Sequence, residues 1–307
     1  MLANFFGKSN PIHFFVILAL FVSYFMVFVF FGEGQLITIN FTFYDYLKVL
    51  SLLLLGFLIF NFILSKSKLT LENSYAFLIF VVLFGVFPVT MFAVDDLILN
   101  FFTLILIRKL LTYRNQNEKL QKLFDSGFWL GVLILLQPFS ILYFLLVIIA
   151  VTLFYKLTLH NIIIIITGII PPLLFCFTYW FILDSLENFY KLFWLYTDYD
   201  FSWLLDSSVK IPLLIFITIT IISLFVKTPK IISISGKYRS FWSLTVSYLA
   251  LSFLLITLLE NKVNGFLLCF FPMTVIITNW LEGLPKRWMK EIFLGFLILL
   301  PFMWIII

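Results

Sequence analysis

Residues 84–111 read FGVFPVTMFAVDDLILNFFTLILIRKLL, and this stretch decides how the rest of the chain is interpreted. It has two apolar halves, joined by the short turn AVDD at residues 93–96. Two carboxylates stand at this turn, and Arg108 and Lys109 close the second half at its other end. Charged side chains are costly inside a bilayer, so they mark where a helix leaves it. The stretch therefore predicts a membrane hairpin with charge at both faces of the membrane.

The composition of the whole chain also indicates a membrane protein. Of its 307 residues, 63% are hydrophobic and 11% are charged, and the mean hydropathy is +1.15. Soluble domains carry about 25% charged residues, so lipid must surround most of this chain. The net charge of +5 comes from short clusters beside apolar runs and not from one basic face, which argues against nucleic-acid binding. Cys176 and Cys269 lie inside apolar runs and predict neither a disulfide nor a metal site, and we expect no cofactor.

One apolar run has two interpretations. Residues 123–155 would form a single helix of about 50 Å, which is too long for one membrane crossing and short for two. Gln137-Pro138 interrupts this run, because proline removes a helix hydrogen bond. The run is therefore either one kinked span or two short spans that fold back at Pro138. The remaining apolar runs cover residues 12–31, 46–64, 73–92, 97–111, 161–183, 209–226, 241–259, 265–281 and 291–307.

The distribution of lysine and arginine decides between these interpretations. If the chain folds back at Pro138, 16 of the 20 cations lie on one face and four on the other, namely Lys48, Lys191, Lys210 and Lys262. If Pro138 is only a kink, the split is 11 to 9. Cytoplasmic loops carry the excess of Lys and Arg. The sequence therefore predicts an all-α polytopic transmembrane bundle of about 11 spans, a single membrane domain over residues 1–307, with a cytoplasmic N-terminus and a periplasmic C-terminus.

Two further patterns predict local structure. In the long outer loop, residues 184–208, apolar side chains recur at helical spacing, which predicts an amphipathic helix flat in the outer interface. Gly127 and Gly131 are four residues apart and favour close contact between two helices. The periodic residues of the loop are Leu186, Phe189, Tyr190, Phe193 and Trp194.

The outer face carries the candidate functional residues. Asp95 and Asp96 are the candidate catalytic pair, since two carboxylates could hold a divalent cation against a pyrophosphate or supply a general base. The favoured alternative is a polar cap, in which acids at a helix N-terminus match its dipole. Asn100 follows one helical turn later and could extend a polar pocket inward.

A second outer segment, residues 196–203, combines aromatic rings with carboxylates, a combination that suits sugar rings. Asp198, Asp200 and Trp203 are its candidate substrate-binding residues, and an interfacial belt of Tyr and Trp is the favoured alternative. No Asp, Glu, Lys or His lies clearly at mid-membrane in the predicted spans. This argues against an ion-coupled transporter or a proton pump.

Five segments carry a family resemblance: residues 3–11 (ANFFGKSNP), 125–131 (DSGFWLG), 168–171 (GIIP), 260–261 (EN) and 271–272 (FP). They resemble an uncharacterised family of multi-pass inner-membrane proteins of Bacteroidota, and this resemblance covers nearly the whole chain. It implies a multi-pass location in the cell inner membrane and no known activity. Residues 73–183 contain an outer acidic turn, an inner arginine-rich loop, a glycine-rich helix and a proline-broken helix pair. On these features the segment weakly resembles GT-C-type polyprenyl-linked glycosyltransferases.

Three functional hypotheses stay open at this point. The favoured one is an integral inner-membrane protein that supports cell-envelope assembly or a membrane complex. The alternative, which the weaker resemblance implies, is a GT-C-like transferase that takes a sugar from a lipid carrier at the periplasmic face. The third is the flipping of a lipid or lipid carrier. The expected partners are the lipid bilayer and either a membrane protein or a polyprenyl lipid.

Overall fold

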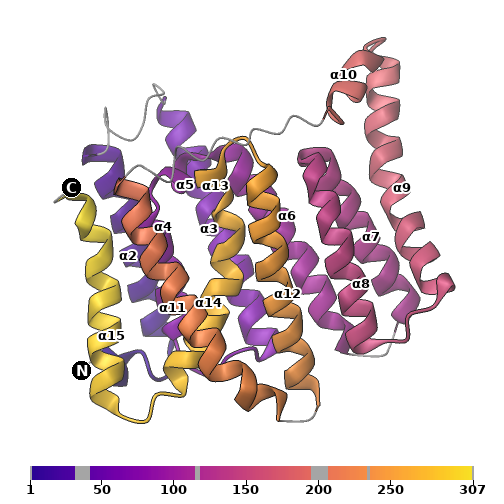
Figure 1. The fold of residues 1–307 in the computed structure, drawn as a ribbon. Helices are drawn as coiled ribbons and strands as arrows, with labels where there is room; N and C mark the ends of the chain where they lie inside the picture. Colours follow the sequence, from indigo (N-terminus) through magenta and orange to yellow (C-terminus); the bar gives the residue numbers. More distant parts are fainter. Residues whose placement is uncertain (1, 32–41, 115–117, 195–206, 234–235, 306–307) are drawn as a thin grey trace. The chain divides into compact units, whose positions relative to one another are not determined.

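A computed structural model describes residues 2–31, 42–114, 118–194, 207–233 and 236–305. Every regular element in these ranges is a helix (Figure 1), as the sequence predicts. Contacts within the chain divide it into two compact units, which we describe separately. Unit 1 is Met1–Leu97, Asp200–Ile234 and Val263–Ile307, and unit 2 is Ile98–Tyr199 and Ser235–Lys262.

Six of the described helical segments are long and apolar enough to cross a membrane. This identifies the chain as a membrane protein, because an apolar helix of about 20 residues matches the thickness of the hydrocarbon core. Their burial inside the protein differs widely: 83% of the most apolar window is buried in the segment that ends at Glu282, and 17% in the segment that begins at Leu159. The six segments are Pro11–Phe30, Phe43–Ser67, Leu159–Ile182, Lys210–Ile232, Tyr238–Leu258 and Lys262–Glu282.

Unit 1 is built around α4 (Tyr75–Val86), in which every side chain except Phe77 is buried. Phenylalanine rings fill the contacts around it. Phe80 of α4 stacks on Phe60 of α3, with ring centroids 4.0 Å apart, and Phe84 meets Phe270 of α14 edge to face. The other helices of unit 1 are α1 (Leu2–Phe5), α2 (Pro11–Phe31), α3 (Phe43–Ser67), α5 (Val89–Phe92), α11 (Ser207–Ile232), α14 (Leu267–Glu282), α15 (Arg287–Leu299) and η4 (Leu300–Ile305).

The apolar run over residues 73–92 does not form one continuous helix. α4 ends at Val86 and α5 begins at Val89. Phe87 leaves the helical conformation, with φ −117° and ψ 68°, because a residue before proline is disfavoured in the helical region and Pro88 has no N–H to donate. The next helix, α6 (Val94–Leu111), begins before Asp95 and Asp96, so both acids lie in its first turn.

Unit 2 contains the ambiguous run, and the chain folds back in it. α7 (Lys119–Leu136) ends at an extended Gln137, and η2 (Pro138–Leu142) leads into α8 (Tyr143–Phe154). The Lys119 ammonium, at the start of α7, lies 5.1 Å from the ring centroid of Tyr155, which follows α8. The two helices are therefore antiparallel, which is the fold-back interpretation and not the single kinked span.

The remaining helices of unit 2 include a tightly packed pair, α7 and α9 (Leu159–Ile182). α7 packs against α9, and glycines on both helices bring the two backbones together. A β-carbon on Gly127 would overlap the carbonyl oxygen of Ile165, and one on Gly131 would lie 2.6 Å from Cγ of Pro172. The predicted close contact at Gly127 and Gly131 is confirmed. The other elements are most of α6, η1 (Thr112–Arg114), α10 (Leu186–Lys191) and α12 (Lys237–Leu258).

The predicted amphipathic helix of the outer loop is present only in part. α10 covers six residues, fewer than the periodic pattern that runs on to Trp194. Its Phe189 packs edge to face against Phe177 of α9, with ring centroids 5.4 Å apart, so part of its apolar face is used within unit 2. Residues 195–206 lie outside the described part of the chain.

Candidate functional site

The acidic turn at the start of α6 is the first candidate site, and it belongs to unit 1. Asp95 is exposed, whereas Asp96 is partly buried. The side-chain amide of Asn264, in α13 (Lys262–Gly265), hydrogen-bonds to the Asp96 carboxylate. Asn264 is thus a neighbour of the site that the sequence analysis missed, and nothing in the sequence pairs the two positions.

The environment of Asp96 changes its acidity. Burial raises the pKa of the Asp96 carboxyl from 3.8 to about 6, and the negative charge of Asp95 adds to this rise, whereas the hydrogen bond from Asn264 opposes it. A carboxyl with such a pKa exchanges its proton near neutral pH, which suits a general acid or base. Both acids also lie in the first turn of α6, where negative charge is favourable to the helix dipole. The arrangement fits both interpretations of the pair.

The other predicted site residues are placed as follows. Asn100 is buried in α6, one turn after Asp96, and its Oδ1 has no hydrogen-bond partner. Asp198, Asp200 and Trp203 lie outside the described residues. In the described ranges, no three His, Cys, Asp or Glu side chains come together in a group that could hold a metal ion.

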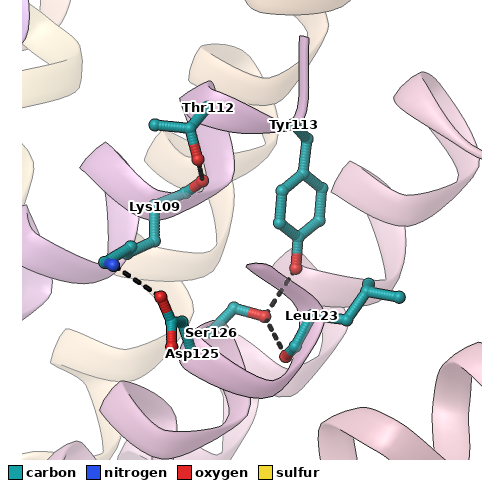
Figure 2. Close-up of polar contacts among 6 residues, drawn as sticks. All are labelled: Lys109, Thr112, Tyr113, Leu123, Asp125 and Ser126. Atoms are coloured by element: carbon teal, nitrogen blue, oxygen red, sulfur yellow. Dashed lines mark hydrogen bonds and ion pairs between the residues drawn. The ribbon is translucent and has the colours of Figure 1, made fainter. Parts of the chain in front are cut away.

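A second polar cluster lies in unit 2, where α6 and η1 meet α7 (Figure 2). The Lys109 ammonium pairs with the Asp125 carboxylate at 2.6 Å. The hydroxyls of Tyr113 and Ser126 are 2.5 Å apart, and Ser126 also donates to the carbonyl of Leu123 at 2.8 Å. Tyr113 is fully buried, and burial raises the pKa of its phenol, so the phenol stays neutral. These contacts fasten the loop after α6 to the first turns of α7.

The sequence analysis did not single out this cluster as a site. One signal was available: Asp125 is an acid within an apolar run, and Asp125 and Ser126 open the segment DSGFWLG. An acid at such a position requires a cationic partner, which the structure identifies as Lys109. The cluster has no nucleophile next to a base, so its geometry is that of a structural anchor.

A third cluster lies at one end of unit 1 and centres on Glu282, the last residue of α14. Its carboxylate accepts hydrogen bonds from the backbone N–H of Leu71 at 2.9 Å and from Nδ2 of Asn73 at 2.6 Å. The Lys290 ammonium donates to the backbone carbonyl of Glu282 at 3.0 Å. Glu282 therefore ties the loop before α4 to the end of α14 through its carboxylate, and it ties the beginning of α15 there through its backbone carbonyl.

Comparison with known protein families gives one match. A family model described as a family of unknown function matches residues 5–306, almost the full length of the chain. No curated protein and no solved structure matches the chain. The match therefore places the chain in a family without transferring an activity to any residue.

Proposed function

The chain belongs to the family of unknown function DUF6427, and from this premise we propose that it is a multi-pass protein of the bacterial inner membrane that supports cell-envelope assembly or a membrane complex. On this proposal residues 1–307 form one integral membrane domain. The bilayer is its first partner, and a further membrane protein its second. The observation that carries the proposal is the exposure of α9, a 24-residue apolar helix with few buried residues.

α9 supports the proposal because it is packed on one side only. Its glycine-bearing face meets α7, and Ile165 and Gly168 are buried there. Large apolar side chains cover the rest of the helix, and Phe175 is 74% exposed. In water this surface would be strongly unfavourable, whereas lipid tails or an apolar partner helix would cover it without cost. The other exposed side chains include Ile163, Leu174, Tyr179 and Ile182.

We further propose eleven crossings with the N-terminus in the cytoplasm. The six long apolar segments supply six of them. α4 with α5, α6, α7, η2 with α8, and α15 with η4 supply the other five. A short helix such as α4 is compatible with this arrangement, because neighbouring helices and not lipid surround its ends.

Charge at one end of unit 1 supports the proposed orientation. Hydrogen bonds bring the segment before α2, the beginning of α4, the end of α14 and the beginning of α15 together. Ser74 donates to the carbonyl of Lys8, Asn279 to that of Leu69, and Lys290 to that of Glu282. The cations in these connecting segments are those that the positive-inside rule assigns to the cytoplasm. They are Lys8, Lys66, Lys68, Lys286, Arg287 and Lys290.

Fractionation of cells that express the protein tests its location. We expect the protein in the inner-membrane band of a density gradient and in the pellet after alkaline carbonate extraction, which removes peripheral proteins. Recovery in the outer-membrane band or in the carbonate supernatant would contradict the proposal.

A photo-crosslinking amino acid on α9 tests the proposed role in a membrane complex. We expect a discrete protein adduct when the crosslinker replaces Phe175, because this position faces outward. The matched control is Ile165 on the same helix, which is fully buried and should give no adduct to another protein. Adducts to lipid alone at Phe175 would limit α9 to a lipid-facing role and would count against a protein partner there.

The acidic pair favours a second candidate function, a GT-C-like transferase that uses a polyprenyl-linked sugar. Asp96 has the raised pKa that a general base requires, and on this proposal Asn100, Asp198, Asp200 and Trp203 bind the substrate. The test is the double variant Asp95→Asn with Asp96→Asn, produced at the normal level. Unchanged cell-envelope composition in cells that carry this variant would remove the catalytic proposal while leaving the membrane role intact.

A further inference from the structure

The cluster around Glu282 is rich in positive charge. Lys227 and Lys230, near the end of α11, and Lys290, on α15, all interact electrostatically within this cluster. Glu282 is the carboxylate whose negative charge acts on Lys227. The Glu282 carboxylate already accepts two hydrogen bonds, from Leu71 and Asn73, and it interacts with the ammonium groups of Lys227 and Lys290.

Helix ends add negative charge to the cluster. α11 and α14 both end at the cluster, and a helix C-terminus carries roughly half a negative charge. Lys230 is exposed and adds a further positive charge beside Lys227. Lys227 and Lys290 are partly buried, and solvent screens partly buried charges less well than fully exposed charges.

The packing holds one of these ammonium groups against the backbone. A β-carbon on Gly283 would overlap both Nζ and Cε of Lys227, so the lysine lies directly over this glycine. Neither Lys227 nor Lys230 is paired with a carboxylate at salt-bridge distance in the described part of the chain. Both ammonium groups keep N–H donors for an external anion.

The position of the cluster identifies the source of that anion. Two membrane-crossing segments, Lys210–Ile232 and Lys262–Glu282, end at it, so it lies at the level where a bilayer presents its head groups. Trp288, in the first turn of α15, is 57% exposed, and tryptophan favours this interface. A lipid phosphate is therefore the anion present at the highest local concentration.

We propose that Lys227, Lys230 and Lys290 bind the phosphate of an anionic phospholipid head group at this end of unit 1. The proposal rests on the membrane location proposed above. Each ammonium group supplies hydrogen-bond donors to phosphate oxygens, and Glu282 holds the elements that carry Lys227 and Lys290 in place. A zwitterionic lipid gains less, because its own cation is repelled by the same lysines.

Native mass spectrometry of the full-length protein in detergent tests the proposal, with phosphatidylglycerol and phosphatidylcholine as the added lipids. A lysine near the membrane surface contributes about 1 kcal/mol to the attraction of anionic lipid, which equals about 5-fold in affinity. We expect the double variant Lys227→Gln with Lys290→Gln to bind phosphatidylglycerol about 25-fold more weakly. Binding of phosphatidylcholine should be unchanged.

The matched control is the double variant Lys48→Gln with Lys210→Gln, which removes the two unit 1 lysines proposed to face outward. It should keep wild-type affinity for phosphatidylglycerol. The charge-preserving variant Lys227→Arg with Lys290→Arg should also keep most of the affinity. If the glutamine pair does not fold, the single variant Lys230→Gln takes its place, because Lys230 is exposed, and we expect a loss of about 5-fold.

Three results would overturn the proposal. One is equal binding of the two lipids, and another is wild-type affinity in the glutamine variants. The third is complete displacement of phosphatidylglycerol by millimolar inorganic phosphate, which would indicate a general anion site and not a lipid site. Each of these results leaves the carbonate extraction unaffected, so failure of the lipid site is distinguishable from failure of the proposed membrane location.

Discussion

The contact between α7 and α9 gives the sharpest prediction, because glycine on both helices lets their backbones touch. We consider the substitution Gly168→Ala. Its methyl group would overlap the carbonyl oxygen of Phe124 and would lie 3.1 Å from Cα of Gly127. Both atoms belong to the backbone of α7, so the clash can be relieved only if one helix moves away from the other.

The size of the effect follows from two opposing contributions. Alanine favours the helical conformation over glycine by about 1 kcal/mol. Overpacking in a tight contact costs about 1–3 kcal/mol, and the upper value applies here because backbone atoms of two helices must separate. We therefore expect Gly168→Ala to lower the free energy of unfolding by about 2 kcal/mol.

The chain contains a glycine that serves as a matched control. A β-carbon on Gly56, within α3, would meet no atom within 4 Å, so Gly56→Ala keeps the gain of about 1 kcal/mol without any clash. The two variants should differ by about 3 kcal/mol when unfolding in mixed micelles is followed by circular dichroism. A Gly168→Ala protein as stable as the wild type would refute the close contact between α7 and α9.

Two further predictions concern the polar clusters. Ser126→Ala leaves the Tyr113 hydroxyl buried without its partner and should destabilise the protein by about 1–3 kcal/mol. The double variant Ser126→Ala with Tyr113→Phe should lose less stability than the sum of the losses in the two single variants, measured in the same assay. Additive losses would contradict a direct hydrogen bond between the two side chains. Because burial raises the pKa of Asp96 from 3.8 to about 6, its contribution to stability is complete below about pH 4 and is lost as the pH rises through 6. This loss amounts to at most about 3 kcal/mol. Asp96→Asn should abolish this loss of stability between pH 4 and 7. If the free energy of unfolding of this variant depends on pH as strongly as that of the wild type, the assignment to Asp96 is contradicted.

Much of the helical architecture follows from local features of the sequence. Gln137-Pro138 predicts a break, and the count of Lys and Arg correctly favours a chain that folds back there. Gly127 and Gly131 predict the close contact with α9, because their spacing places both on one helix face. The break at Phe87-Pro88 was missed, although Pro88 carries the same local signal. Residues 73–92 have the length expected for one membrane span, and this length favoured a single helix in spite of Pro88.

The clusters at Asp96 and Glu282 depend on contacts between distant parts of the chain, so the sequence could not predict them. Asp96 is recognisable as an acid at a turn, but its raised pKa requires the burial and the Asn264 contact that only the fold provides. Glu282 is an ordinary acid at the end of an apolar run. Its role emerges only when the loop that carries Leu71 and Asn73 packs beside it.

The central claim is that the chain crosses the membrane both before and after Pro138, and one labelling experiment tests it most directly. In a background with Cys176→Ser and Cys269→Ser, single cysteines replace the exposed residues Lys156, between α8 and α9, and Asp184, after α9. A maleimide that cannot cross the inner membrane is then added to cells with an intact inner membrane, under conditions in which it reaches the periplasm. We predict that the Asp184→Cys variant is labelled, and that the Lys156→Cys variant is labelled only after the inner membrane is permeabilised. Labelling of the Lys156→Cys variant in intact cells, with protection of the Asp184→Cys variant, would contradict the proposed topology.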